Sequence, residues 1–542
     1  MGKLFFYNGN ILTMNEKKSV QSVVVENNNI TFCGDYDKGL EYIDDNTRHI
    51  DLKGKTLLPG FNDSHMHLLS YSMTKHKVDL SDCKSIKEVQ SKIKEFAKKE
   101  KDGIFGDWIL GHGWNHENFE EKRLLTKEDI DEVVNDRPVF LARACYHICA
   151  VNSKALARVK IDKNTKAPEG GKIDKSKVTG EPTGILRENG LYLAYTNIPI
   201  TDDVEKIKEL ITSAIEDANK VGITSIQTDD FSHIKNYKNI IKAYEELNNE
   251  NKLNARMNLQ MLFPNLEELK SFLQTGVTTG DGDEFLKYGP LKVLGDGSLG
   301  SRTAALEKPY NDDETTDGVL IQTDDELEEI LKTAYNSGLQ LAVHAIGDRC
   351  MNQVLDTYIK LNKENPKEDP RFRIIHSQIC SEEIYNKYLE VDAIADIQPI
   401  FMKTDMYMAE DRIGSERMKT SYCWKTMLDK GIKLSGSSDA PVESFNPLWG
   451  IYSAITRKDL EGNPKSGWYK EERLDLYETL ELFTKNSAYS TYEEDIKGMI
   501  KEGMLADLVV LSEDITHIEV DNIKNIDVEM TIVDGEIVYK RK

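Results

Sequence analysis

From about residue 200 the sequence alternates apolar runs with stretches long enough to form a helix, and this alternation limits the fold strongly. Thr201-Asp202-Asp203 predicts a helix start, and the apolar residues from Val204 to Ala218 keep helical spacing until Gly222. The later apolar runs are predicted strands: 223–227, 257–262, 291–294, 339–344, 372–376, 393–398 and 432–435. With the earlier run that ends in His-Met-His they make eight. Eight parallel strands with intervening helices predict an α/β fold, a TIM-type (β/α)8 barrel with its reactive groups where strands end.

Both chain ends carry a different pattern, made of short β-type runs separated by turn residues. Near the N-terminus these runs are 4–7, 11–14, 23–26 and 30–33, with Asn27-Asn28-Asn29 as a turn. Near the C-terminus they are 507–511, 530–533 and 536–539, the last two joined by Asp534-Gly535. We therefore expect residues 1–58 and 490–542 to build one β-sandwich domain, and residues 59–489 to form the barrel domain.

Residues from about 80 to 200 do not fit a single barrel repeat. They hold a charged amphipathic helix at 85–99, a Trp-Gly stretch at 107–119, an apolar run at 137–147 and a Gly/Lys-rich loop at 170–177. We interpret this part as a long insertion after the first barrel strand, near the barrel mouth.

Composition excludes several classes of partner. Lys and Arg total 70 against 93 Asp and Glu, so the net charge of −23 disfavours nucleic acid and anionic membranes. No run of eighteen apolar residues and no secretory leader pattern occurs. The seven scattered cysteines are typical of free thiols in a reducing compartment. A cytoplasmic protein that acts on a small molecule is expected, and a homodimer is among the oligomeric states that the sequence allows.

Two histidines, His65 and His67, end the first predicted strand. Successive strand residues point to opposite faces, so these two side chains share a face while Met66 packs on the other. They could bind one metal ion, although polar residues at a strand end are an equally good explanation of the pair alone.

Four more ionisable residues stand at predicted strand ends. Lys292 follows Gly289-Pro290, His344 ends LQLAVH, His376 ends FRIIH, and Asp439 follows IKLSGSS. Each has an ordinary structural explanation by itself, such as a hydrogen-bonded core histidine or an Asx turn. Together with the first pair they make six such residues at the strand ends of one barrel, which favours a metal site.

Motifs along nearly the whole chain resemble the amidohydrolase superfamily. The closer resemblance is to its amidohydrolase-3 branch, the YtcJ-like proteins that include N-substituted formamide deformylases. The motifs that carry it are PGFNDSHMHL, GHGWN, RPVFLARACYH, VNSKAL, PTGILREN, LKVLGDGSLGSRTAAL, HAIGD, GSSDAPVESFNPL and GMLADLVVL. The resemblance implies a metal-dependent hydrolase barrel that carries a β-sandwich built from both chain ends, and it says little about the substrate.

The resemblance also implies the roles of the six residues. His65 and His67 would bind a first divalent ion together with Asp439, His344 and His376 would bind a second, and Lys292 would bridge them as an N6-carboxylated lysine. A carboxylated lysine offers two oxygens, whereas an ammonium group has no lone pair for a metal. Zinc suits imidazole and carboxylate ligands; manganese, iron and cobalt stay open, as does the choice between one ion and two.

The expected reaction is hydrolysis of a carbon–nitrogen bond other than a peptide bond, in an amide or N-substituted formamide. A metal-activated hydroxide would attack the carbonyl, and Asp439 would act first as general base and then as general acid. A lactonase or esterase-type reaction at the same site, including phosphoester cleavage, is one alternative. A non-catalytic small-molecule-binding or regulatory protein is the other.

Five residues are candidates for substrate contact: Trp114, His147, Glu188, Arg302 and Gln398. One departure from the family pattern lies beside His147. Where many relatives have Asp-Gly-His, this chain has Cys145-Tyr146-His147, which predicts a bulkier pocket wall and a changed specificity.

Overall fold

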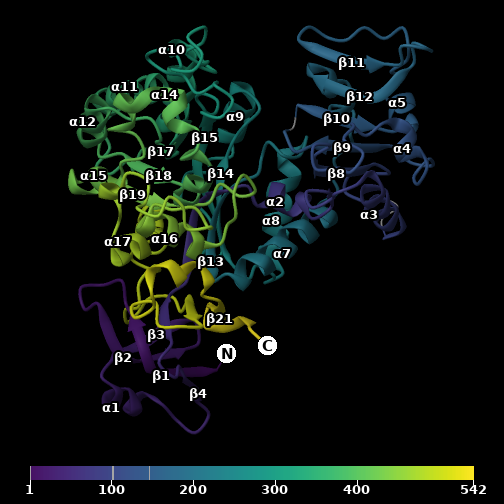
Figure 1. Ribbon diagram of the computed structural model, residues 1–542. Coiled ribbons are helices and arrows are strands. Elements are labelled where there is room, and N and C mark those ends of the chain that lie inside the picture. Colours follow the sequence, from purple (N-terminus) through teal and green to yellow (C-terminus); the bar gives the residue numbers. More distant parts are fainter. Residues whose placement is uncertain (1, 100–102, 146) are drawn as a thin grey trace. The chain divides into compact units, whose positions relative to one another are not determined.

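The computed structural model describes residues 2–99, 103–145 and 147–542 (Figure 1). The chain divides into two compact units. The larger one contains the residues up to Ser70, Ile211–His233 and Ile240–Lys542; the smaller one contains Tyr71–Leu210 and Ile234–Asn239.

Eight parallel strands in chain order form the centre of the larger unit. They are β6 (Phe61–Met66), β13 (Ile223–Asp229), β14 (Arg256–Met261), β15 (Leu286–Leu294), β16 (Leu341–Ala345), β17 (Arg373–His376), β18 (Ile394–Ile397) and β19 (Lys433–Gly436). Each pair of neighbours in this order is hydrogen-bonded and parallel. The predicted (β/α)8 barrel is confirmed, and all eight predicted runs contain a strand.

The first and last barrel strands meet just beyond the end of β19. No ladder joins β6 to β19 in the described ranges, but the backbone N–H of Asp439 donates to the carbonyl of His65 at 2.9 Å. The N–H of His67 donates to the carbonyl of Ala440 at 2.8 Å. We call this junction the seam of the barrel, and it carries three of the predicted metal ligands.

Helices follow the strands, and several of the longer ones bury apolar residues at helical spacing. On α11 (Asp348–Glu364), for example, Cys350, Val354 and Leu361 are buried and recur at this spacing. The helices after the barrel strands are α7 (Val204–Lys220), α8 (Tyr237–Asn249), α9 (Leu266–Leu273), α10 (Asp324–Asn336), α11 (Asp348–Glu364), α12 (Glu382–Val391), α13 (Met402–Asp405), α14 (Ala409–Met418), α15 (Trp424–Asp429), α16 (Pro447–Thr456), α17 (Leu476–Leu482) and α18 (Lys485–Tyr489). Asp203 caps α7 as predicted, because its carboxylate accepts the N–H groups of Glu205 and Lys206.

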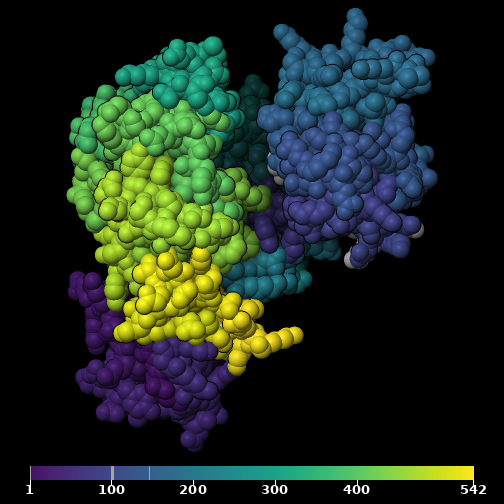
Figure 2. Space-filling model, viewed as in Figure 1, coloured from purple at the N-terminus to yellow at the C-terminus, as the bar shows by residue number. Residues whose placement is uncertain are grey.

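Strands from both chain ends join in one eight-stranded sheet of the larger unit. They are β1 (Lys3–Leu12), β2 (Ser19–Glu26), β3 (Asn29–Gly34), β4 (Arg48–Asp51), β5 (Thr56–Pro59), β20 (Leu508–Leu511), β21 (Val528–Val533) and β22 (Glu536–Lys540), with the short helix α1 (Tyr36–Gly39) after β3. β20 pairs with β5, so the two chain ends lie together, as Figure 2 shows in purple and yellow. This sheet is consistent with the expected sandwich. The runs expected at 4–7 and 11–14 form one strand, with a shift in register between Tyr7 and Ile11.

A buried ion cluster ties this terminal sheet to the base of the barrel. The guanidinium of Arg256, at the start of β14, lies 2.6 Å from Asp507 and 2.9 Å from Asp534. Charges that are removed from water need partners of opposite sign, and here two carboxylates flank one cation.

The smaller unit has its own six-stranded sheet, in the order β11-β12-β10-β9-β8-β7. Its strands are β7 (Val78–Asp79), β8 (Ile109–Trp114), β9 (Val139–Arg143), β10 (Ile148–Val151), β11 (Gly171–Lys175) and β12 (Pro182–Glu188). The helices in this stretch of chain are α2 (Leu68–Thr74), which begins in the larger unit, α3 (Ile86–Lys99), α4 (Lys127–Asp131), α5 (Ser153–Arg158) and α6 (Tyr192–Tyr195).

The expectation of a loop at 170–177 is wrong, because residues 171–175 form the edge strand β11. Only Ile173 of this strand is buried, so its sequence lacks the apolar alternation of an inner strand. Lysines are common on such edges, where they oppose pairing with another chain. All seven cysteines are free thiols, and none of the helices in the described ranges is long and apolar enough to cross a membrane.

Candidate functional site

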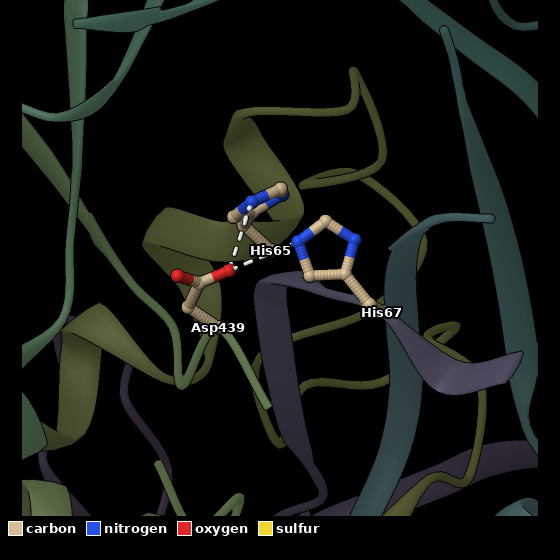
Figure 3. A group of neighbouring side chains, drawn as sticks. All are labelled: His65, His67 and Asp439. Atoms are coloured by element: carbon tan, nitrogen blue, oxygen red, sulfur yellow. Dashed lines mark ion pairs between the residues drawn. The ribbon is translucent and has the colours of Figure 1, made fainter. Parts of the chain in front are cut away.

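His65, His67 and Asp439 converge at the carboxyl ends of the first and last barrel strands (Figure 3). One carboxylate oxygen of Asp439 lies 3.3 Å from Nε2 of His65 and 3.1 Å from Nε2 of His67. One potential ligand atom from each residue lies within 4.8 Å of the other two. The seam of the barrel therefore brings Asp439 against two histidines that come from the first barrel strand, far from it along the chain.

Hydrogen bonds on the far side of each ring set the direction of the imidazoles. Nδ1 of His65 lies 2.6 Å from the side-chain oxygen of Gln260, whose amide nitrogen donates to the carbonyl of Ser64. Nδ1 of His67 lies 2.8 Å from the carbonyl oxygen of Asp229. Both acceptors require the ring proton on Nδ1, so Nε2 of each ring is the atom that faces Asp439.

Two buried atoms of this group fit a metal ion. Nε2 of His65 and the inner carboxylate oxygen of Asp439 are buried and make no hydrogen bond, although only 3.3 Å separates them. A neutral imidazole with its proton on Nδ1 has a lone pair at Nε2, and in His65 this lone pair faces the carboxylate oxygen. Two lone pairs that face each other in a buried site are costly, and a cation between them removes that cost.

Electrostatics within the group decide which of the three residues carries a proton. Burial and, next, the positive charge of Lys292 lower the pKa of His65 to about 4. Burial also opposes charge on His67, but its contacts with Asp439 outweigh burial and raise the pKa of His67 to about 9. Burial would raise the pKa of Asp439, yet the two histidines hold it well below its usual range. Without a cation, His67 thus carries a proton that a metal ion would have to displace.

The other three predicted ligands lie on neighbouring strands of the barrel. The ring centroids of His344 and His376 are 4.4 Å apart, and the ring centroids of His376 and His65 are 5.9 Å apart. Lys292, on β15, is buried, and its ammonium nitrogen lies 3.1 Å from a carboxylate oxygen of Asp229. Burial opposes ionisation of Asp229, whereas Lys292 lowers its pKa.

Two side chains orient the second pair of histidines. Nδ1 of His376 lies 2.8 Å from the amide oxygen of Gln398, whose amide nitrogen donates to Ser437. Nδ1 of His344 lies 3.1 Å from the carboxylate of Asp296, but the directions do not meet those of a hydrogen bond. Gln398, a candidate for substrate contact, thus contacts a predicted ligand.

Left-handed backbone occurs at two of the predicted ligands. The φ angles are +85° at His376, +51° at Ser377 and +57° at Asp439, where residues other than glycine are strained. Such strain persists only where the surrounding structure enforces it, and it is common at functional sites.

The remaining substrate candidates contact residues outside this group of predicted ligands. Arg302 pairs with Asp312 at 2.8 Å on the connection after β15. In the smaller unit His147 and Glu188 pair at 2.8 Å, both exposed, and Glu188 has a φ of +48°. Trp114 is fully buried in that unit's core, and its indole N–H donates to the carbonyl of Leu141. Tyr146, expected in the pocket wall, lies outside the described residues.

Several residues of the site were not found from the sequence. Asp229 ends the second barrel strand, so the rule that located the other ligands would have found it. Gln260 lies within β14, and no local pattern distinguishes it from an ordinary strand residue. His233, whose Nε2 lies 3.3 Å from Nδ1 of His67, follows a strand end in a loop with no motif.

Comparison with known proteins shows which family the chain is similar to. Residues 48–539 match the sequence profile of the amidohydrolase family. The chain is 35% identical to YtcJ of Bacillus subtilis (strain 168) over 99% of this chain and 100% of that protein. It is 26% identical to the N-substituted formamide deformylase of Arthrobacter pascens, over 100% of this chain and 99% of the enzyme.

A solved structure shows the same fold. The crystal structure of an uncharacterized metal-dependent hydrolase from Pyrococcus furiosus aligns with a TM-score of 0.77 and 30% identity, over 94% of this chain and 99% of that one. Because the family profile and these full-length likenesses span most of the sequence, the chain belongs to the amidohydrolase family.

Proposed function

We propose that the protein is a metal-dependent hydrolase that cleaves the carbon–nitrogen bond of an amide or N-substituted formamide. The observation that carries the proposal is the convergence of His65, His67 and Asp439, with buried atoms that lack a hydrogen-bond partner. The likeness to a metal-dependent hydrolase and to an N-substituted formamide deformylase supports it.

In this proposal His65, His67 and Asp439 hold a first divalent ion, and His344 and His376 hold a second. Zinc suits this set of imidazole and carboxylate donors. Lys292 would join them as a carboxylated lysine, for which its amine must give up the ion pair with Asp229. A divalent ion at such a site acidifies water and polarises a carbonyl group.

We propose Asp439 as the general base. Its inner oxygen faces the two histidines, and its carboxylate stays ionised because they hold its pKa low. In this role Asp439 accepts a proton from the attacking water and then donates that proton to the nitrogen of the departing amine. Gln260 and Gln398 keep His65 and His376 in position through the reaction.

Contacts to the substrate are proposed for two groups. Arg302 would face the substrate only if it exchanged its partner Asp312 for a substrate carbonyl or carboxylate. His147 and Glu188 offer an exposed imidazole–carboxylate pair on a strained backbone. Trp114 is too deeply buried for such a contact. The free thiols support a cytoplasmic location, and the substrate is a small molecule.

The test is amine release from a panel of N-substituted formamides, N-acyl amines and cyclic amides, by protein loaded with zinc, manganese or cobalt. Lactones and phosphoesters in the same panel test the alternative reactions at this site. Release of amine that requires the metal supports the proposal. Turnover confined to lactones or phosphoesters, or no turnover of the panel by metal-loaded protein, would contradict it.

A further inference from the structure

Asp63 is a buried carboxylate that lies across the seam and belongs to none of the predicted ligands. Its side chain is 2% exposed. One of its oxygens accepts the backbone N–H of Ser438 at 3.1 Å and the N–H of His65 at 3.2 Å. The other accepts the hydroxyl of Ser438 at 2.5 Å. The carboxylate thus connects His65, two residues before His67, to Ser438, the residue just before Asp439.

The seam gives these bonds their importance. Elsewhere around the barrel a ladder of hydrogen bonds pairs each strand with the next, whereas β6 and β19 have no ladder in the described residues. Two backbone hydrogen bonds among the described residues cross at this point, from Asp439 to His65 and from His67 to Ala440. The distance between the histidines and Asp439 therefore depends on a few bonds, among them the three that the side chain of Asp63 accepts from both sides of the seam.

Ser438 also connects the carboxylate to the strained turn. Its hydroxyl oxygen accepts the N–H of Ala440 at 3.1 Å, so the turn that contains Asp439 is held on both sides. Asp439 has a φ of +57°, which costs free energy and needs such support.

We propose that Asp63 and Ser438 form a clamp that assembles the first metal site before an ion binds, which makes Asp63 a positioning residue. The clamp holds the histidine strand and the Asp439 turn at the separation that one ion can bridge. This inference rests on the proposed function in one respect: that His65, His67 and Asp439 bind a metal. Groups that orient metal ligands typically change metal affinity by about 10- to 100-fold when they are removed.

The test uses the full-length protein and the variants Asp63→Asn, Ser438→Ala and their combination. Zinc affinity is measured by competition with a chelator, the absorption spectrum of bound Co²⁺ reports ligand geometry, and thermal unfolding is followed with and without metal. We expect each single variant to bind zinc about 10-fold or more weakly and to change the Co²⁺ spectrum. The double variant should bind zinc only a little more weakly than the single variant with the lower zinc affinity, because both changes open the same clamp.

Asp405→Asn is the matched control. Asp405 is also a buried carboxylate that accepts a hydroxyl, that of Tyr422 at 2.9 Å, and the amide N–H of Gln378 at 3.2 Å, so these bonds do not join the two sides of the seam. We expect it to lower the unfolding temperature while zinc affinity and the Co²⁺ spectrum stay as in the wild type.

The outcomes separate the two proposals. If the variants lower the unfolding temperature equally with and without metal and leave zinc affinity unchanged, the clamp is only structural and the inference fails. Independent, additive losses of affinity would overturn it as well. If Asp63→Asn does not fold, Ser438→Ala alone decides, since Asp63 keeps both backbone bonds there. A wild-type protein that binds no ion would overturn the proposed function and the inference with it.

Discussion

The ammonium nitrogen of Lys292 lies 3.1 Å from a carboxylate oxygen of Asp229, and each side chain is only 1% exposed. Neither charge has water to stabilise it, so each depends on the other. The other oxygen of Asp229 is buried and has no hydrogen-bond partner. This relationship makes Asp229 the residue on which the charge of Lys292 depends in the metal-free protein.

Replacement of Asp229 by Asn should therefore destabilise the metal-free protein by about 3–5 kcal/mol, because the lysine charge stays buried without its counter-ion. Urea unfolding of the metal-free protein measures this free energy. The double variant Asp229→Asn with Lys292→Met is the control and should recover much of the loss. A single variant as stable as the wild type would show that the lysine charge does not depend on Asp229.

Replacement of Asp439 by Asn should lower kcat by about 10²- to 10⁴-fold, which is the usual contribution of a general acid–base group. The amide keeps an oxygen for the metal, so a substantial part of the bound zinc should stay. Steady-state kinetics together with metal analysis of the purified variant test both statements. Full turnover in this variant would remove Asp439 from the proposed role.

Removal of the metal should abolish turnover and lower the unfolding temperature. Binding to the folded state alone stabilises it by RT ln(1 + [L]/Kd), about 2.7 kcal/mol at 100 times Kd. The measurement is turnover and calorimetry after treatment with a chelator, and again after zinc, manganese or cobalt is restored. Turnover that survives complete removal of metal would contradict the proposed chemistry.

The raised pKa of His67, about 9, predicts that a rise in pH lowers the stability of the metal-free protein and raises its affinity for metal. In the metal-free protein the paired, protonated His67 stabilises the fold fully below its unfolded pKa near 6.5, and this contribution is lost as pH rises through 9. Metal binding must displace that proton, so affinity should rise by about 10-fold per pH unit up to pH 9. Zinc titrations and unfolding between pH 6 and 10 test this, with His67→Asn as the control. An affinity that does not change with pH would contradict it.

Replacement of Arg256 by Ala should destabilise the protein by about 3–5 kcal/mol, because Asp507 and Asp534 lose the cation between them. The cluster lies at the start of β14, the end of the barrel away from the ligands, so zinc affinity should not change. Denaturant unfolding and zinc titration of the same variant measure the two effects. A large loss of zinc affinity would mean that the two ends of the barrel are coupled.

The barrel could be predicted because its signal is repeated eight times. Each inner strand is buried on both faces and reads as an apolar run, and the ligands stand out because a charged side chain at the end of such a run is unusual. The strand β11 was missed for the opposite reason: it is an edge strand with one buried residue and lysines on its exposed face. Its apolar signal is too weak to distinguish it from a loop.

Partners of the ligands could not be predicted, since they are defined by contacts between distant parts of the chain. Gln260 is an ordinary strand residue until β14 places it beside His65. Asp63 was visible in the motif next to the histidines, but its contact with Ser438 depends on how the barrel closes. Sequence pattern locates strand ends, whereas closure decides which ends face each other.

The pairing of β5 with β20 has a consequence for how the chain is made. A ribosome delivers residues 1–58 first, but the neighbour of β5 arrives only with residues 508–511. Through nearly all of translation the apolar edge at Leu57 and Leu58 has no strand on that side, and it is exposed to other nascent chains. A stop codon just before residue 508 would leave the barrel sequence complete, but β5 would keep an unpaired edge. Such a truncated product should therefore aggregate during synthesis.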